Sequence, residues 1–217
     1  MTAELRKKKP GDRIGDVGHR AFVGGTDLET WYGIGKLQYH FLVANGLEPQ
    51  HRFLDIACGA LRLGQYLIPY LQHSYYFGLD AHEELVRSGL SGEFFANIVD
   101  KKQPIFAFNS DFDFSFIEKF DVAIAQSLFT HLTREDIRLC FRNLRPHAHA
   151  QSRFWFTFFE GDEAKNPAGP SDANLGWYYA YKDLAADAAG CGWTTRLIGD
   201  WQHPRRQSIV LALPAQA

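Results

Sequence analysis

Apolar residues recur along this chain at two spacings that alternate from one segment to the next. From Leu28 to Ala44 they return every three or four positions, as at Ile34 and Leu37, which is typical of a helix with one buried side. Gly46 is expected to end this helix. The same spacing predicts further helices over residues 62–71, 83–87, 136–144 and 181–189.

Short unbroken apolar runs lie between these helices and predict buried strands. They cover residues 52–57, 75–79, 105–108, 120–125, 153–159, 194–198 and 208–213. Alternating strands and helices indicate a parallel sheet with helices on both faces. The last two strands are joined by about nine residues that include Pro204, too few for a helical crossover, so they should pair antiparallel. The expected fold class is therefore α/β: a doubly wound, mainly parallel seven-stranded sheet with an antiparallel last strand.

The 217 residues contain no internal repeat and no linker-like stretch, which favours a single domain over residues 1–217. The first twenty or so residues show no usable periodicity. We therefore expect residues 1–45 to form an N-terminal cap or lid and residues 46–214 to form the core of the domain.

Composition narrows the functional classes. The formal net charge is −2 and the one basic run is Arg6–Lys9, so no global attraction to nucleic acid is expected. No apolar run is long enough for a membrane span, and the first residues do not look like a signal peptide, which predicts a cytoplasmic protein. The three cysteines are far apart, and His147 and His149 have no third ligand nearby in the sequence, so no metal site is expected.

Three segments that follow predicted strands carry the candidate chemistry. The turn at residues 57–60 is rich in small residues and lets a ligand approach the backbone, although an ordinary strand–helix turn would look similar. Asp80 ends the second strand, where a carboxylate can bind the two hydroxyls of a ribose or cap the next helix. Asp111 and Phe112 follow the third strand and suit an adenine, or form a surface turn.

Together these segments resemble the class I S-adenosylmethionine-dependent methyltransferases over roughly residues 20–214. The motifs that carry the resemblance are Leu-Asp-Ile-Ala-Cys-Gly at 54–59, Gly-Leu-Asp at 78–80, the strand 120–125 with Gln-Ser-Leu-Phe-Thr-His-Leu after it, and the terminal hairpin. Arg-Ala-Phe-Val-Gly-Gly at 20–25 resembles a bacterial subgroup. Ala57 and Leu61 stand where the family's Asp-x-Gly-x-Gly-x-Gly turn has glycines. At Ala57 we expect a negative φ, and at Leu61 a slightly different start of the helix.

The resemblance implies S-adenosylmethionine as cofactor, with S-adenosylhomocysteine as product, and a role for each matching residue. The backbone at Ala57, Cys58 and Gly59 would hold the methionine part, with Arg62 nearby and Asp55 reaching its amino group. Asp80 would bind the ribose, with Ala81 beside the adenine. The remaining cofactor residues implied are Asp111 and Phe112 around the base, Gln126 and Ser127 under the methionine chain, and Tyr32, beside Trp31, in the segment that closes over the cofactor.

Methyl transfer to a hydroxyl or amine is helped by a general base, and three residues are candidates. His131 follows the fourth strand, Glu160 ends the fifth strand, and His203 lies between the last two strands. Each has a plainer interpretation: a histidine bonded to nearby backbone, a solvated loop carboxylate and a surface turn residue.

The sequence thus favours an enzyme that methylates oxygen or nitrogen of a small molecule. The Asn/Asp-Pro-Pro-Tyr/Phe stretch typical of enzymes that methylate bases or side-chain amides is missing after residue 125. Two other functions stay open: a cofactor-binding protein without turnover, suggested by Ala57 and Leu61, and a nicotinamide-dependent oxidoreductase, suggested by Asp80. No nucleic-acid or membrane partner is expected, and the protein would be a monomer or a homodimer.

Overall fold

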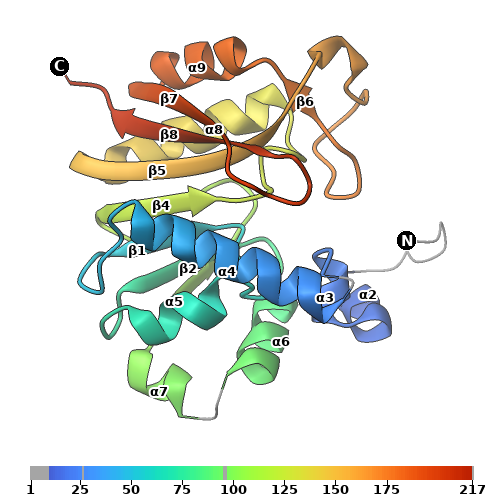
Figure 1. Ribbon diagram of the computed structural model, residues 1–217, viewed down its shortest axis with the longest axis vertical. Coiled ribbons are helices and arrows are strands. Elements are labelled where there is room, and N and C mark those ends of the chain that lie inside the picture. Colours follow the sequence, from blue (N-terminus) through green and yellow to red (C-terminus); the bar gives the residue numbers. More distant parts are fainter. Residues whose placement is uncertain (1–9, 26, 95–96, 217) are drawn as a thin grey trace. The chain divides into compact units, whose positions relative to one another are not determined.

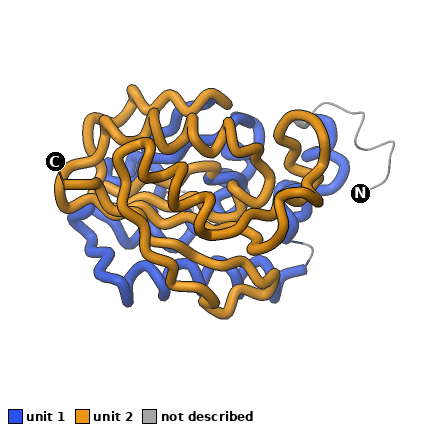
Figure 2. Tube along the Cα trace, turned by 90° about the horizontal axis from the view of Figure 1, so that it is seen from above, with its two compact units in different colours: residues 1–51, 58–109 blue, residues 52–57, 110–217 orange. Residues whose placement is uncertain are grey.

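The computed structural model describes residues 10–25, 27–94 and 97–216, and these form two compact units. Unit 1 consists of residues 1–51 and 58–109, and unit 2 of residues 52–57 and 110–217, within those described ranges (Figure 2). Each unit is built from helices and strands that follow one another along the chain (Figure 1). That the whole chain is one domain, with residues 1–45 as a lid, stays a prediction.

Unit 1 contains six helices and two strands among its described residues. They are α2 (Pro10–Val17), α3 (His19–Phe22), α4 (Leu28–Ala44), α5 (Gly64–Tyr70), β2 (Tyr76–Asp80), α6 (Glu83–Glu93), α7 (Ile98–Lys102) and β3 (Ile105–Phe108). β2 and β3 pair in parallel, with Gly78 opposite Phe106. α2 and α3 pack against α6 (Figure 1).

The long helix of unit 1 is well defined by its sequence, whereas α2, α3, α7 and the last residues of α6 were not predicted. α4 starts after Asp27, whose carboxylate accepts a hydrogen bond of 2.7 Å from the backbone N–H of Thr30. α2 and α3 lie in the stretch where the sequence shows no periodicity. α6 continues to Glu93 although the predicted helix ended at residue 87. Its Gly89 weakens the helical signal, but a side chain there would come within 2.5 Å of the Ala60 carbonyl oxygen, so the glycine permits close packing.

Unit 2 contains the larger set of strands. Its elements are β1 (Phe53–Ile56), β4 (Phe120–Ala125), α8 (Arg134–Leu144), the 3-10 turn η1 (Arg145–His147), β5 (Ala148–Glu160), the 3-10 turn η2 (Glu163–Lys165), β6 (Tyr178–Tyr179), α9 (Tyr181–Gly190), β7 (Trp193–Asp200) and β8 (Ser208–Pro214). β1 pairs with β4, β4 with β5, and β5 with the short β6, all in parallel. β8 is antiparallel to both β5 and β7.

Within unit 1, hydrogen bonding joins β3 to β2, and within unit 2 it orders the strands β1-β4-β5-β8-β7, with β6 beside β5 off this path. This confirms the predicted α/β fold class, including the antiparallel last strand and all seven predicted strands. The short β6 was not predicted. β5 begins earlier than the predicted residue 153 because the polar Ser152 is accommodated: its hydroxyl donates to the Phe120 carbonyl at 2.6 Å.

Aromatic side chains form the core of unit 2 where α8 meets the strands. Their ring centres lie 5.0–6.2 Å apart, and the residues are Phe129, Phe141, Phe154, Phe156 and Trp193. The Trp193 indole donates to the Phe141 carbonyl at 3.0 Å. The guanidinium of Arg134 on α8 binds both carboxylate oxygens of Asp187 on α9, which joins these two helices. These aromatic residues therefore serve the core of unit 2.

None of the helices in the described ranges is long and apolar enough to cross a bilayer.

Candidate functional site

The turn after β1 is a sharp bend that contains three residues with positive φ. Asp55 is buried in β1, opposite Ile124 of β4. Ala57 has φ 60°, Gly59 has φ 56° and Leu61 has φ 63°. The negative φ expected at Ala57 is therefore wrong: the alanine adopts the left-handed conformation that glycine adopts without steric cost. α5 begins only at Gly64, two residues later than predicted, so the helix does start differently here.

Asp80 at the end of β2 fixes this turn from within unit 1. One carboxylate oxygen accepts the Gly59 backbone N–H at 2.8 Å, and the other accepts the His82 N–H at 2.9 Å. Burial raises the pKa of Asp80, and the hydrogen bonds from His82 and Gly59 partly offset that effect. The alternative role as an N-cap does not hold, because α6 begins after His82 without a side-chain cap.

The neighbours of Asp80 complete the turn. The buried Cys58 donates its backbone N–H to the Leu79 carbonyl at 3.0 Å, and Asn109 donates to the Asp80 carbonyl at 3.1 Å. Ala81 follows Asp80 and is exposed. The Ala81 backbone N–H is a third donor to this carboxylate. A carboxylate has about four acceptor positions, so capacity for a further hydrogen bond is left. This arrangement suits a ribose hydroxyl.

The N-terminal segment of unit 1 lies against the same turn. The Arg62 guanidinium donates to the Val23 carbonyl and stacks over the Trp31 ring, 5.1 Å from its centre. Tyr32 is half-buried, and its hydroxyl lies 3.2 Å from Arg20 Nη2. Arg62 thus helps to fix the segment against the turn, and its implied place near the cofactor stays a prediction.

In unit 2, Asp111 and Phe112 differ in exposure. Asp111 is exposed, and its carbonyl accepts from the Asn143 side chain at 3.1 Å. Phe112 is buried, has φ 57° and stacks on Phe114 with ring centres 6.4 Å apart. The left-handed backbone at Phe112 turns this ring inward, so residues 111–112 are more than a plain surface turn.

A network of neutral polar side chains follows β4. Ser127 has φ 56°, and its backbone N–H donates to Thr157 Oγ1 at 2.7 Å. Its hydroxyl oxygen accepts from Gln126 Nε2 at 2.5 Å and from Gln207 Nε2 at 2.7 Å. Gln126 Nε2 also lies 3.1 Å from His203 Nε2. The structure therefore brings together Gln126, Ser127 and His203, three of the residues that the sequence singled out.

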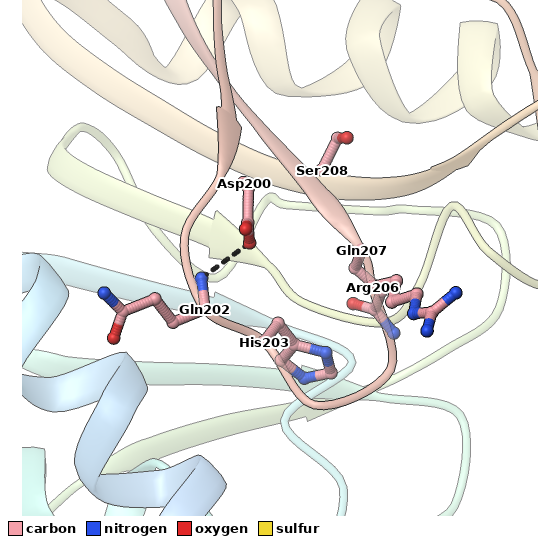
Figure 3. Close-up of a pocket in the computed structure, with 6 residues that line it drawn as sticks. All are labelled: Asp200, Gln202, His203, Arg206, Gln207 and Ser208. Atoms are coloured by element: carbon pink, nitrogen blue, oxygen red, sulfur yellow. Dashed lines mark hydrogen bonds between the residues drawn. The ribbon is translucent and has the colours of Figure 1, made fainter.

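His203 belongs to the loop between β7 and β8, and it is not a surface turn residue. Its side chain is buried and stacks on Trp201 with ring centres 5.2 Å apart, while the Trp201 indole donates to the Gln207 carbonyl. The loop encloses a hollow of about 430 Å³. Its lining residues are Asp200, Gln202, His203, Arg206, Gln207 and Ser208. In Figure 3 the loop curves around this hollow, and the Gln202 and Arg206 side chains extend outward on opposite sides.

His131 is held by the backbone of the long loop before β6. Its Nδ1 lies 2.6 Å from the Leu175 carbonyl oxygen, which can only accept, so Nδ1 carries the proton and Nε2 is left as an acceptor. Burial lowers the pKa of His131; the Leu175 hydrogen bond opposes this, and the charge of Arg205 adds to it. His131 therefore has both the backbone bond of the plainer interpretation and a neutral nitrogen suited to accept a proton.

Glu160 is exposed at the end of β5, opposite Tyr179 of β6. Nothing in its described contacts joins it to His131 or His203. In the described part of the chain, no group of three or more His, Cys, Asp or Glu side chains is placed to hold a metal ion. His147 and His149 have separate partners: the Ile117 carbonyl at 2.6 Å and the Asp121 carboxylate at 3.0 Å.

Three residues of these contacts were missed from the sequence, two in unit 2 and one in unit 1. Thr157 is a hydroxyl inside the apolar run 153–159, a signal that the sequence does contain. Gln207 directly precedes the last strand and is buried. Glu93 accepts hydrogen bonds from the N-terminal segment, and it was missed because the predicted helix ended before it.

Comparison with known proteins identifies the fold. No protein-family model matches the chain, and no curated protein sequence matches it significantly. Magnesium protoporphyrin IX methyltransferase from Synechocystis PCC 6803, with bound S-adenosylhomocysteine, is similar with a TM-score of 0.63 and 18% identity, over 87% of this chain and 87% of that one. An S-adenosylmethionine-dependent methyltransferase from Clostridium acetobutylicum gives a TM-score of 0.65 and 12% identity, over 94% and 99%.

A TehB-like S-adenosylmethionine-dependent methyltransferase from Corynebacterium glutamicum is similar with a TM-score of 0.60 and 17% identity, over 95% of this chain and 98% of that one. The chain therefore has the fold of the S-adenosylmethionine-dependent methyltransferases. At these identities the likeness establishes the fold, and the chemistry has to be argued from the residues of this chain.

Proposed function

We propose that the protein is a methyltransferase that uses S-adenosylmethionine and acts on oxygen or nitrogen of a small molecule. The observation that carries this proposal is the pairing of the Gly59 turn with the Asp80 carboxylate, which keeps acceptor capacity for a ribose hydroxyl. The shared fold and the ligands named for its solved neighbours support the same cofactor.

The cofactor-binding residues proposed are those implied by the resemblance, taken unit by unit. In unit 1 they are Tyr32, Cys58, Gly59, Arg62, Asp80 and Ala81. In unit 2 they are Asp55, Ala57, Asp111, Phe112, Gln126 and Ser127. Arg62 has a positioning role in this proposal, because its guanidinium binds the Val23 carbonyl.

When bound, S-adenosylmethionine supplies a methyl group activated by its sulfonium. The chain has to orient an acceptor and take up its proton as the new bond to the methyl carbon forms and the bond to sulfur breaks. His131 is the proposed base, because Nε2 is free of the proton that Nδ1 uses toward Leu175, and because its lowered pKa keeps it neutral near pH 7. His203 and Glu160 are the second candidates for this role.

Calorimetric titration with S-adenosylmethionine and S-adenosylhomocysteine tests the cofactor. We expect micromolar binding to the wild type, and about a hundredfold weaker binding to Asp80→Ala, since the charged acceptor for the ribose is lost. Asp100→Ala is the matched control, because Asp100 is an exposed aspartate on α7 of the same unit. NAD is titrated in parallel. Binding of NAD in place of both sulfur ligands would turn the assignment to an oxidoreductase.

A cofactor-binding protein without turnover is the second candidate, favoured by the methyl group of Ala57 and the side chain of Leu61 at positions where glycine is usual. Transfer of a labelled methyl group to a panel of hydroxy and amino compounds separates the two functions. Tight binding of the cofactor, with no methyl transfer to any compound of the panel, would favour the binding protein. In that case His131→Gln should also bind the cofactor as tightly as the wild type. The protein is proposed to act in the cytoplasm, as a monomer or homodimer, without a nucleic-acid or membrane partner.

A further inference from the structure

Glu93, the last residue of α6, accepts an unusual number of hydrogen bonds for one carboxylate. Its Oε1 accepts from Arg20 Nε at 2.6 Å and lies 2.7 Å from His19 Nε2. Its Oε2 accepts from Arg20 Nη2 at 2.9 Å and from the Trp31 indole at 3.3 Å. The side chain is 1% exposed. A buried carboxylate is stable only with such partners, so this cluster is a built feature of unit 1.

All three donors belong to the N-terminal segment, by which we mean residues 18–25 and 27–32. His19 and Arg20 lie on α3, and Trp31 lies in the first turns of α4. Arg20 also stacks over the rings of Trp31 and Tyr32, 5.7 and 5.3 Å from their centres. A helix as short as α3 is not stable by itself in water, so tertiary contacts must fix its position. The strongest of these contacts is the bidentate hydrogen bond that the Glu93 carboxylate accepts from the Arg20 guanidinium.

The same segment covers the glycine turn. A Cβ on Gly59 would lie 3.3 Å from a methyl group of Val23, and the Val23 carbonyl accepts from Arg62. Trp31 is fully buried with Ala60 of the turn and Leu85 of α6, and Val23 and Tyr32 pack against this cluster. The N-terminal segment, the turn and α6 therefore pack together, and Glu93 provides the ion pair between α6 and the segment.

The charge states of Glu93 and Arg20 support a lasting ion pair between them. Burial raises the pKa of Glu93, but hydrogen bonds from Arg20 and His19 and their charges more than offset this and lower it below its ordinary value. The Arg20 hydrogen bond to Glu93 in turn raises the pKa of Arg20. The carboxylate and the guanidinium are therefore both charged at neutral pH.

We propose that Glu93 is a positioning residue for cofactor binding: its carboxylate holds the N-terminal segment against the Gly59 turn and so keeps Tyr32 and the turn in binding geometry. The ligand in this inference rests on the proposed function, whereas the contact itself lies entirely within unit 1. An exposed pair on the same helix shows the contrast. Glu83 and Arg87 also form an ion pair, at 2.6 Å, but both side chains are solvent-exposed, whereas that of Glu93 is buried.

Two measurements on the full chain test the proposal: amide hydrogen exchange of residues 18–32, and the Kd of S-adenosylhomocysteine. In Glu93→Gln we expect exchange in this segment to rise about tenfold and the Kd to rise about tenfold, the usual size of coupling between a positioning contact and a ligand. Arg20→Gln breaks the same contact from a half-exposed position, so it serves if Glu93→Gln folds poorly. Since both changes break the same Arg20–Glu93 ion pair, their effects on the Kd should not add in the double variant.

Glu83→Gln is the matched control and should alter neither measurement. Exchange that rises uniformly over both units in Glu93→Gln, with an unchanged Kd, would show a merely structural role and overturn the proposal. Unchanged exchange at residues 18–32 in both single variants would overturn it as well. If the wild type binds no S-adenosylhomocysteine, the proposed function fails, while the exchange measurement still decides whether Glu93 holds the segment.

Discussion

The turn after β1 and the turn after β4 both contain residues other than glycine in the left-handed conformation, but they are supported in different ways. Ser127, with φ 56°, is held by hydrogen bonds from its backbone and to its hydroxyl, which involve Thr157, Gln126 and Gln207. Ala57 and Leu61, with φ 60° and 63°, have side chains that make no hydrogen bond. Each such residue costs about 1–2 kcal/mol in backbone strain.

The comparison shows what the two missing glycines change. Where polar groups surround the strained residue, its side chain contributes to holding the strain, and the residue type matters. Where the side chain is apolar, the backbone takes up the same conformation that glycine would, and the cost falls on stability. The turn after β1 therefore keeps its shape with alanine and leucine. This weakens the argument that the altered glycines abolish cofactor binding.

The largest effect is expected at Leu61, which is fully buried. Leu61→Ala should lower the free energy of unfolding by about 3 kcal/mol through the cavity it leaves. Leu61→Gly removes one more carbon atom but relieves the left-handed strain, so it should be as stable as Leu61→Ala, or up to about 1 kcal/mol more stable. Urea unfolding of the two variants measures the difference.

Leu67 provides the control, because at an ordinary helical position the glycine variant should be less stable than the alanine variant. It is also fully buried, but it lies inside α5 with helical backbone. There the glycine variant should be about 1 kcal/mol less stable than the alanine variant. The same order at residues 61 and 67 would mean that Leu61 carries no strain that glycine can relieve.

The next effect concerns the polar support of Ser127. Thr157→Val keeps the shape of a fully buried side chain and removes the acceptor for the Ser127 N–H, so unfolding should become easier by about 2 kcal/mol. Thr194→Val, at an exposed position of β7, should change stability by less than about 0.5 kcal/mol. A loss as small as that at Thr157 would show that Ser127 does not depend on this bond.

These two turns also show where the sequence sufficed. The strands and the antiparallel hairpin could be predicted from apolar runs and loop length, because both signals lie in residues that are close together in the sequence. The conformation of Ala57 was predicted wrongly, since residue type alone favours negative φ and the packing that overrides it is not local. The neutral network around Ser127 and the Glu93 contact join residues about 30 to 80 positions apart, a separation that no periodicity reveals.

The smallest effect is the sharpest test of the comparison, because it predicts opposite signs at two alanines of one turn. Ala57→Gly should stabilise the protein by about 0.5–1 kcal/mol, since the relief of left-handed strain exceeds the entropy that glycine gains on unfolding. Ala60 is buried and lies outside the left-handed region, so Ala60→Gly should destabilise by about 1 kcal/mol. Urea unfolding of both variants measures these differences, and destabilisation by Ala57→Gly would show that the alanine methyl contributes packing that outweighs the strain.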